Sequence, residues 1–95
     1  MTGIDDLFVF EAPDDAMEPQ VDRGAQVVWS RSRAPRFGKP VLVRVGDSLY
    51  VRNYEQGRAP GQWLARPVRA GFATFDSAAD PVQLVAAWRG VLDPD

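Results

Sequence analysis

The stretch VLVRVGDSLYVRNY at residues 41–54 decides the fold of this chain. Two arms rich in valine, leucine and tyrosine flank the sequence GDS at 46–48, which is typical turn chemistry between paired antiparallel strands. Side chains alternate between the two faces of a strand, so Val41 and Val43 share one face and Leu42 lies on the other. The stretch therefore predicts a β-hairpin.

The segments on either side of the hairpin are short. Eight glycines and eight prolines interrupt the chain so often that few segments exceed ten residues. This punctuation favours short strands joined by turns over a helical bundle. Further strands are expected at 7–10, 25–29, 62–65, 72–75 and 82–92. The last of these is apolar enough for a helix as well, but its valine and tryptophan content and Gly90 favour a strand.

One short helical turn is expected near residues 15–19, with an aspartate as its cap and Pro19 limiting its length. The predicted fold is mainly β, with bent antiparallel sheets that form an open barrel. The 95 residues are expected to form one domain, with residues 1–6 as a short N-terminal extension.

Composition narrows the classes of protein. With 45% hydrophobic and 25% charged residues, the chain is globular in type. It has no apolar run near the roughly 18 residues that span a bilayer. Residues 1–6 carry acidic side chains where a secretory signal carries basic ones. We therefore expect a cytoplasmic chain that does not associate with membranes.

Cysteine and histidine are both absent from the sequence. This excludes disulfides, thiolate nucleophiles and cysteine-based zinc sites, and it removes the commonest general base and metal ligand. We expect neither a cofactor nor a metal site.

The formal net charge is −2, whereas a domain that binds DNA by itself normally carries a basic patch. Arg31, Arg33 and Arg36 cluster around Pro35 in a segment with the composition of a loop. We interpret this cluster as a solvated loop, with phosphate binding as the alternative.

A second set of motifs points to a family. The block DDAMEP at 14–19, with VDRG at 21–24 and a strand at 26–28, resembles the sequence around the nucleophile of LexA and phage-repressor peptidases. These belong to the signal-peptidase-like superfamily, and their signature is a serine followed by Met and usually Glu-Pro. Three further segments fit the same pattern: the hairpin at 41–54, WLARP at 63–67 and VAAWRGVLD at 85–93.

The resemblance implies a bent β fold with a Ser-Lys dyad, and this chain departs from it at both positions. Ala16 stands at the serine position and Arg52 at the lysine position. Arginine stays protonated in proteins and cannot act as a general base. Loss of the nucleophile alone lowers the turnover of a hydrolase about a million-fold. We therefore expect an inactive domain, with Asp15, Met17 and Arg52 lining the degenerate cleft, and the double departure favours natural divergence over a single silencing mutation.

In the repressors this domain follows a helix-turn-helix and holds the protein together as a dimer. The resemblance thus implies a homodimerising or regulatory module of a phage-repressor-like transcriptional regulator. Its closing strand places four residues near an isologous interface, namely Leu84, Ala86, Trp88 and Val91. Trp88 is the strongest candidate because tryptophan is enriched at interface centres, although such residues can equally belong to the core. Residues 1–6 leave no room for a helix-turn-helix, so direct nucleic-acid binding is not expected.

Two other functions are weighed against this one. A ligand- or peptide-binding domain would reuse the old cleft, with Arg52 binding an anion in a bidentate fork. An active serine peptidase would need a relocated dyad, in which hairpin pairing brings Lys39 towards Tyr54. The serines available to it lie in expected loops or turns, at Ser30, Ser32, Ser48 and Ser77.

Overall fold

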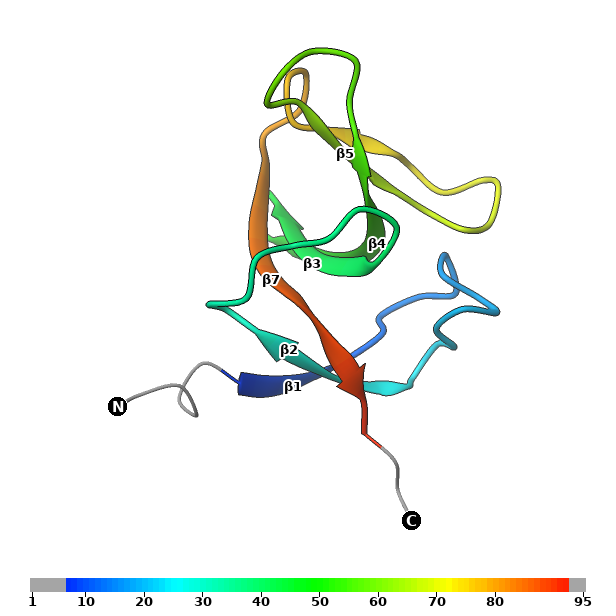
Figure 1. Ribbon diagram of the computed structural model, residues 1–95. Helices are drawn as coiled ribbons and strands as arrows, with labels where there is room; N and C mark the ends of the chain where they lie inside the picture. Colours follow the sequence, from blue (N-terminus) through cyan, green and yellow to red (C-terminus); the bar gives the residue numbers. More distant parts are fainter. Residues whose placement is uncertain (1–6, 93–95) are drawn as a thin grey trace.

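A computed structural model describes residues 7–92, and all of its regular elements are β strands (Figure 1). The strands are β1 (Leu7–Glu11), β2 (Gln26–Ser30), β3 (Pro40–Val45), β4 (Ser48–Gln56), β5 (Trp63–Arg66), β6 (Phe75–Asp76) and β7 (Val82–Val91). They form one antiparallel sheet in the order β1-β2-β7-β3-β4-β5-β6. The predicted mainly β fold is confirmed. The proposed extension at 1–6 lies outside the described residues.

The predicted hairpin forms between β3 and β4. Its register pairs Val41 with Arg52 and closes at Val45 and Ser48. Gly46 has a φ of 61°, in the left-handed region that glycine adopts without strain. Because no described residue other than glycine has a positive φ, the loop has the pattern of a type II′ turn, which needs a positive φ only at its first position.

The helical turn expected near 15–19 is present as hydrogen-bonded turns rather than as a helix. The N–H of Glu18 donates to the carbonyl of Asp15 (3.2 Å), and that of Val21 donates to Met17 (2.8 Å). The turn does not propagate because Pro19 has no N–H to donate. No helix occurs within residues 7–92, so this part of the chain has no helix long and apolar enough to cross a membrane.

The strand predicted at 82–92 is β7, the longest of the sheet. It pairs with β3 over its first half and with β2 over its second half, and in Figure 1 it passes from beside β3 to the end of the molecule where β1 and β2 lie. The register shifts between Leu42 and Val43 on β3, and between Val28 and Trp29 on β2. Such irregularities bend a sheet and increase its twist. Of the strand expected at 72–75, only Phe75 is in a strand.

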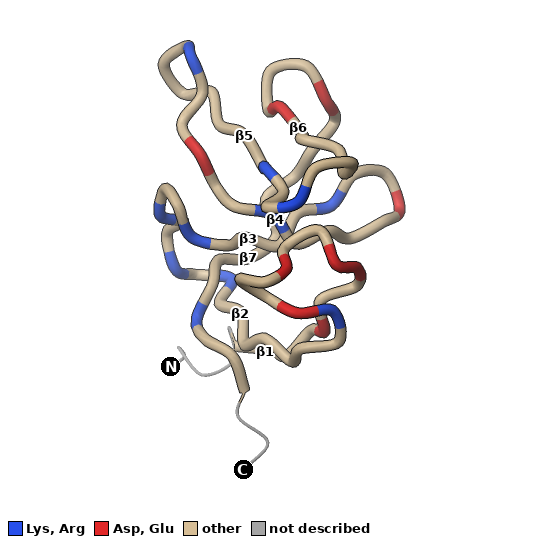
Figure 2. Tube along the Cα trace, turned by 90° about the vertical axis from the view of Figure 1, so that its right-hand side faces the viewer, with Lys and Arg blue, Asp and Glu red and all other residues tan. Residues whose placement is uncertain are grey.

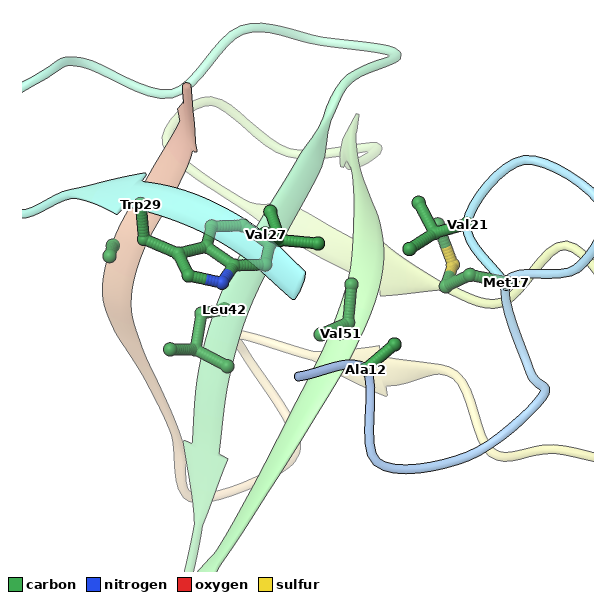
Figure 3. Packing of buried hydrophobic residues seen from close by; sticks show 8 residues of the cluster. Ala12, Met17, Val21, Val27, Trp29, Leu42 and Val51 are labelled. Carbon is green, nitrogen blue, oxygen red and sulfur yellow. The ribbon is translucent and has the colours of Figure 1, made fainter. Parts of the chain in front are cut away.

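The bent sheet buries side chains on both of its faces. One cluster surrounds Trp29, which is fully buried together with Leu42 and Val51, and it includes Met17 from the segment between β1 and β2 (Figure 3). A second cluster contains three buried residues, Val41, Val43 and Ala65. The alternation predicted for the first hairpin arm is therefore confirmed, because Leu42 enters one cluster while Val41 and Val43 enter the other.

We expect Trp29→Ala to lower the free energy of unfolding by about 3–5 kcal/mol, because it removes the largest fully buried side chain and leaves a cavity. Urea denaturation followed by circular dichroism measures the change. Val9→Ala is the control, since Val9 is 50% exposed on β1 and its truncation is expected to change stability by less than about 0.5 kcal/mol. Equal losses in the two variants would contradict the core described above.

Candidate functional site

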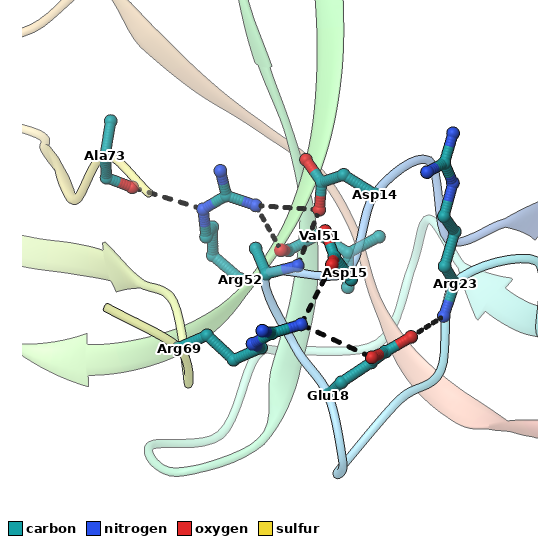
Figure 4. Close-up of polar contacts among 9 residues, drawn as sticks. Asp14, Asp15, Glu18, Arg23, Val51, Arg52, Arg69 and Ala73 are labelled. Carbon is teal, nitrogen blue, oxygen red and sulfur yellow. Dashed lines mark hydrogen bonds and ion pairs between the residues drawn. The ribbon is translucent and has the colours of Figure 1, made fainter. Parts of the chain in front are cut away.

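The two positions matched to the peptidase dyad meet at one carboxylate. Ala16 lies in the turn between β1 and β2, and Arg52 lies on β4. Asp14 Oδ1 accepts the backbone N–H of Ala16 at 3.0 Å and lies 3.7 Å from Nη1 of Arg52 (Figure 4). The tertiary structure therefore brings together two residues that are 36 positions apart in the sequence.

Arg52 is buried, with 2% of its side chain exposed. Its Nη1 donates to the carbonyl of Val51 at 2.8 Å, and its Nε donates to the carbonyl of Ala73 at 3.2 Å. Together with the carboxylate of Asp14, these contacts tie β4 to two separate loops. A buried charge is tolerated where such partners replace its water.

Aromatic rings complete the surroundings of this guanidinium. Its Cζ lies 5.2 Å from the ring centroid of Tyr50, 5.8 Å from that of Phe72 and 5.6 Å from that of Phe75. Ring faces attract a cation within about 6 Å, and more strongly where water is excluded. The positive charge of Arg52 is thus held by one carboxylate, two carbonyls and three rings.

Burial lowers the pKa of Arg52, and the carboxylate of Asp14, followed by Tyr50, opposes that shift. The ordinary pKa of arginine lies so far above neutrality that the side chain stays protonated at pH 7. Arg52 therefore acts at this position as a fixed cation and not as a proton acceptor.

Ala16 is also sealed from solvent, with an exposed fraction of 0%. Its carbonyl accepts the N–H groups of Val68 and Arg69, both at 2.9 Å, which docks the turn against the loop after β5. On the surface above it, Arg69 forms ion pairs with Asp15 (2.8 Å) and Glu18 (3.5 Å). Exposed pairs of this kind contribute about 0–1 kcal/mol each, so the backbone bonds matter more.

The cleft residues expected from the sequence are close together but mostly out of reach of solvent. Met17 is 1% exposed and packs in the Trp29 cluster, Arg52 is 2% exposed, and only Asp15 reaches the surface. Sequence reasoning missed the double role of Asp14. The sequence did indicate a capping aspartate here, and Asp14 does accept the N–H of Ala16. Its contact with Arg52 has no local signal in the sequence.

The four interface candidates on β7 divide into three environments. Leu84 and Val91 are exposed, at 38% and 51%. Trp88 is half-buried and packs edge to face on Trp29, with the ring centroids 6.1 Å apart. Ala86 is 3% exposed and belongs to the core, so it cannot contribute contact area to a partner. Its place on the list is a correction: Ala86 pairs with Leu42 on β3 and packs with it in the Trp29 cluster.

The residues considered for a relocated dyad have structural roles of their own. Hairpin pairing does bring Lys39 beside Tyr54, whose N–H donates to the Lys39 carbonyl at 2.9 Å. The hydroxyl of Ser30 accepts the N–H of Arg33 at 3.1 Å, and that of Ser77 accepts the N–H of Trp63 at 2.9 Å. Both hydroxyls therefore brace loops.

Within residues 7–92, no group of three or more histidine, cysteine, aspartate or glutamate side chains is placed to hold a metal ion. No protein-family model matches the chain, and no curated protein matches it. The resemblance to LexA-type peptidases thus remains a prediction from the motifs.

We expect Arg52→Ala to lower the free energy of unfolding by about 2–4 kcal/mol, because it opens a cavity and leaves the Ala73 carbonyl and Asp14 without their partner. Arg52→Met is the matched control, since it keeps most of the buried volume but removes the charge together with the N–H donors. Its expected loss is smaller because it leaves a smaller cavity, while Asp14 and the Ala73 carbonyl lose their partner in both variants. Denaturant midpoints measure both variants, and wild-type stability in Arg52→Ala would contradict a bracing role.

Proposed function

We propose that this chain is a catalytically inactive, LexA-like domain that serves as a dimerisation or regulatory module of a phage-repressor-like transcriptional regulator. The observation that carries the proposal is the meeting of Ala16 and Arg52 at Asp14 Oδ1. In a Ser-Lys peptidase the nucleophile and its base lie within hydrogen-bond reach of each other. The two positions that the motifs match to that pair are here neighbours across one oxygen atom.

The chemistry at these positions supports a non-catalytic role. Ala16 has no nucleophilic atom, and Arg52 cannot accept a proton at neutral pH. Both residues are buried and bonded to the loops around them. Their burial also favours bracing of the fold over ligand binding at this place, because an incoming carboxylate would have to displace Asp14 from Arg52.

Exposed apolar side chains at one end of the molecule support self-association. β1 and the end of β7 lie at the same end in Figure 1. Four exposed apolar side chains occur there: Leu7, Val9, Val91 and Leu92. β1 is also an edge strand of the sheet, and an edge offers unpaired backbone groups to a second strand. A two-fold axis beside β1 would let the β1 edges of two copies pair with each other.

Sedimentation equilibrium over a wide concentration range tests the dimer. We expect a reversible dimer whose dissociation constant rises at least tenfold in Val91→Glu, which is about 1.4 kcal/mol of association free energy. Val68→Glu is the matched control, because Val68 is 41% exposed but lies on the loop after β5. A strict monomer at every concentration would refute the dimer. Equal weakening by the two variants would show that the dimer interface is not at this end of the molecule.

The absence of catalysis is tested separately with a serine-reactive fluorophosphonate probe. We expect no labelling of the folded chain, because Ala16 replaces the nucleophile. Labelling that disappears when one of the loop serines is changed to alanine would establish a relocated peptidase site and overturn the proposal.

A further inference from the structure

The loop between β2 and β3 forms a hollow against β7. This hollow is shallow, with a cavity volume of about 40 Å³, and is open to solvent. Arg33, Arg36 and Lys39 line it from the loop, and Ala87 and Trp88 line it from β7. It involves neither Ala16 nor Arg52, so its chemistry is independent of the peptidase resemblance.

The cations of this hollow have no acidic partners in the described part of the chain. The ion pairs among residues 7–92 engage Arg52, Arg66 and Arg69, and none engages Arg33, Arg36 or Lys39. Three positive charges around one concave surface, without a carboxylate to neutralise them, concentrate the field on an entering anion.

The charges of the molecule are also unevenly distributed. In Figure 2, Lys and Arg residues gather along the left side beside β2, β3 and β7, while several Asp and Glu residues lie on the right. The net charge of the whole chain is nevertheless −2. A nucleic acid long enough to extend beyond the basic side would meet the acidic residues of the other side, whereas a small anion meets only the local field of the hollow.

The loop is held in place at both ends without any ligand. Near its start, the Ser30 hydroxyl accepts the N–H of Arg33 at 3.1 Å. Near its end, Phe37 stacks on Tyr54 with ring centroids 5.1 Å apart, and the Gly38 N–H donates to the Tyr54 carbonyl at 2.7 Å. A loop fixed in this way loses less conformational entropy when it binds, which leaves more of the interaction energy for affinity.

We infer that this hollow binds the phosphate group of a small phosphorylated molecule. Two guanidinium groups suit phosphate because their paired N–H donors match its oxygens, and an ammonium adds a compact third charge. The cavity volume is about 40 Å³, and one water molecule needs roughly 10–15 Å³, so the hollow has room for one compact anionic group such as phosphate. Trp88, at the same hollow, offers an apolar surface to the organic part of the ligand.

The test is a titration of the whole chain with inorganic pyrophosphate at low ionic strength, followed by calorimetry and by nitrogen–proton NMR. We expect saturable binding that shifts the indole signal of Trp88 and the amides of the 31–39 loop, while the indole signal of Trp63 stays in place. Added salt is expected to weaken the binding, since exposed charges are screened. Phenyl phosphate and inorganic phosphate are then titrated in the same way. Tighter binding of phenyl phosphate would identify an organic phosphate as the natural ligand of the hollow.

Two charge-matched double variants locate the binding. Arg33→Gln/Arg36→Gln is expected to weaken pyrophosphate binding at least tenfold, whereas Arg23→Gln/Arg58→Gln removes the same charge from two exposed sites elsewhere and is expected to leave it within about twofold. Lys39→Gln supplies the test if the first variant unfolds.

Three results would overturn the inference. The first is no saturable binding of pyrophosphate at low salt, and the second is equal weakening in both double variants, which would mean diffuse attraction. The third is tighter binding of a DNA oligonucleotide than of either small phosphate, which would make the surface a nucleic-acid contact.

Discussion

The guanidinium of Arg52 is the contact on which the packing of three chain segments depends. It joins β4 to Asp14 in the segment after β1 and to Ala73 in the loop before β6. An isolated buried charge is strongly unfavourable, so the loops must supply their oxygen atoms at the right places for the charge to remain there. Because apolar residues often replace such groups without loss of stability, we interpret this network chiefly as a device that fixes where the two loops dock.

The sheet provides the frame for that network. β7 pairs with β3 over one half and with β2 over the other, so it carries the sheet from the Trp29 cluster to the cluster around Val41 and Val43. Both faces of β3 are thereby buried. The loops between β1 and β2 and between β5 and β6 then meet, with the N–H groups of Val68 and Arg69 bonded to the carbonyl of Ala16. A polar centre is sealed between them as a consequence of how the sheet bends.

This arrangement separates two regions with different chemistry. Around Arg52, each charge is matched and solvent is nearly absent, which suits a structural centre. Around Trp88, the cations of the neighbouring loop are exposed and have no carboxylate partners within residues 7–92. Trp88 lines this hollow and is also a candidate interface residue, so a partner seated over it would compete with an anion for the same surface.

The sequence by itself determined the strands other than β6 and the turn between β3 and β4, because these follow from local alternation and from the turn chemistry of glycine and proline. It also singled out positions 16 and 52 through motif spacing. Only the tertiary structure decided that Arg52 contacts Asp14, that Met17 and Ala86 are core residues, and that Arg33, Arg36 and Lys39 surround a hollow. The physical reason is that these contacts join segments far apart in the chain. Their geometry depends on how the sheet bends and how its loops dock, and no local pattern encodes either.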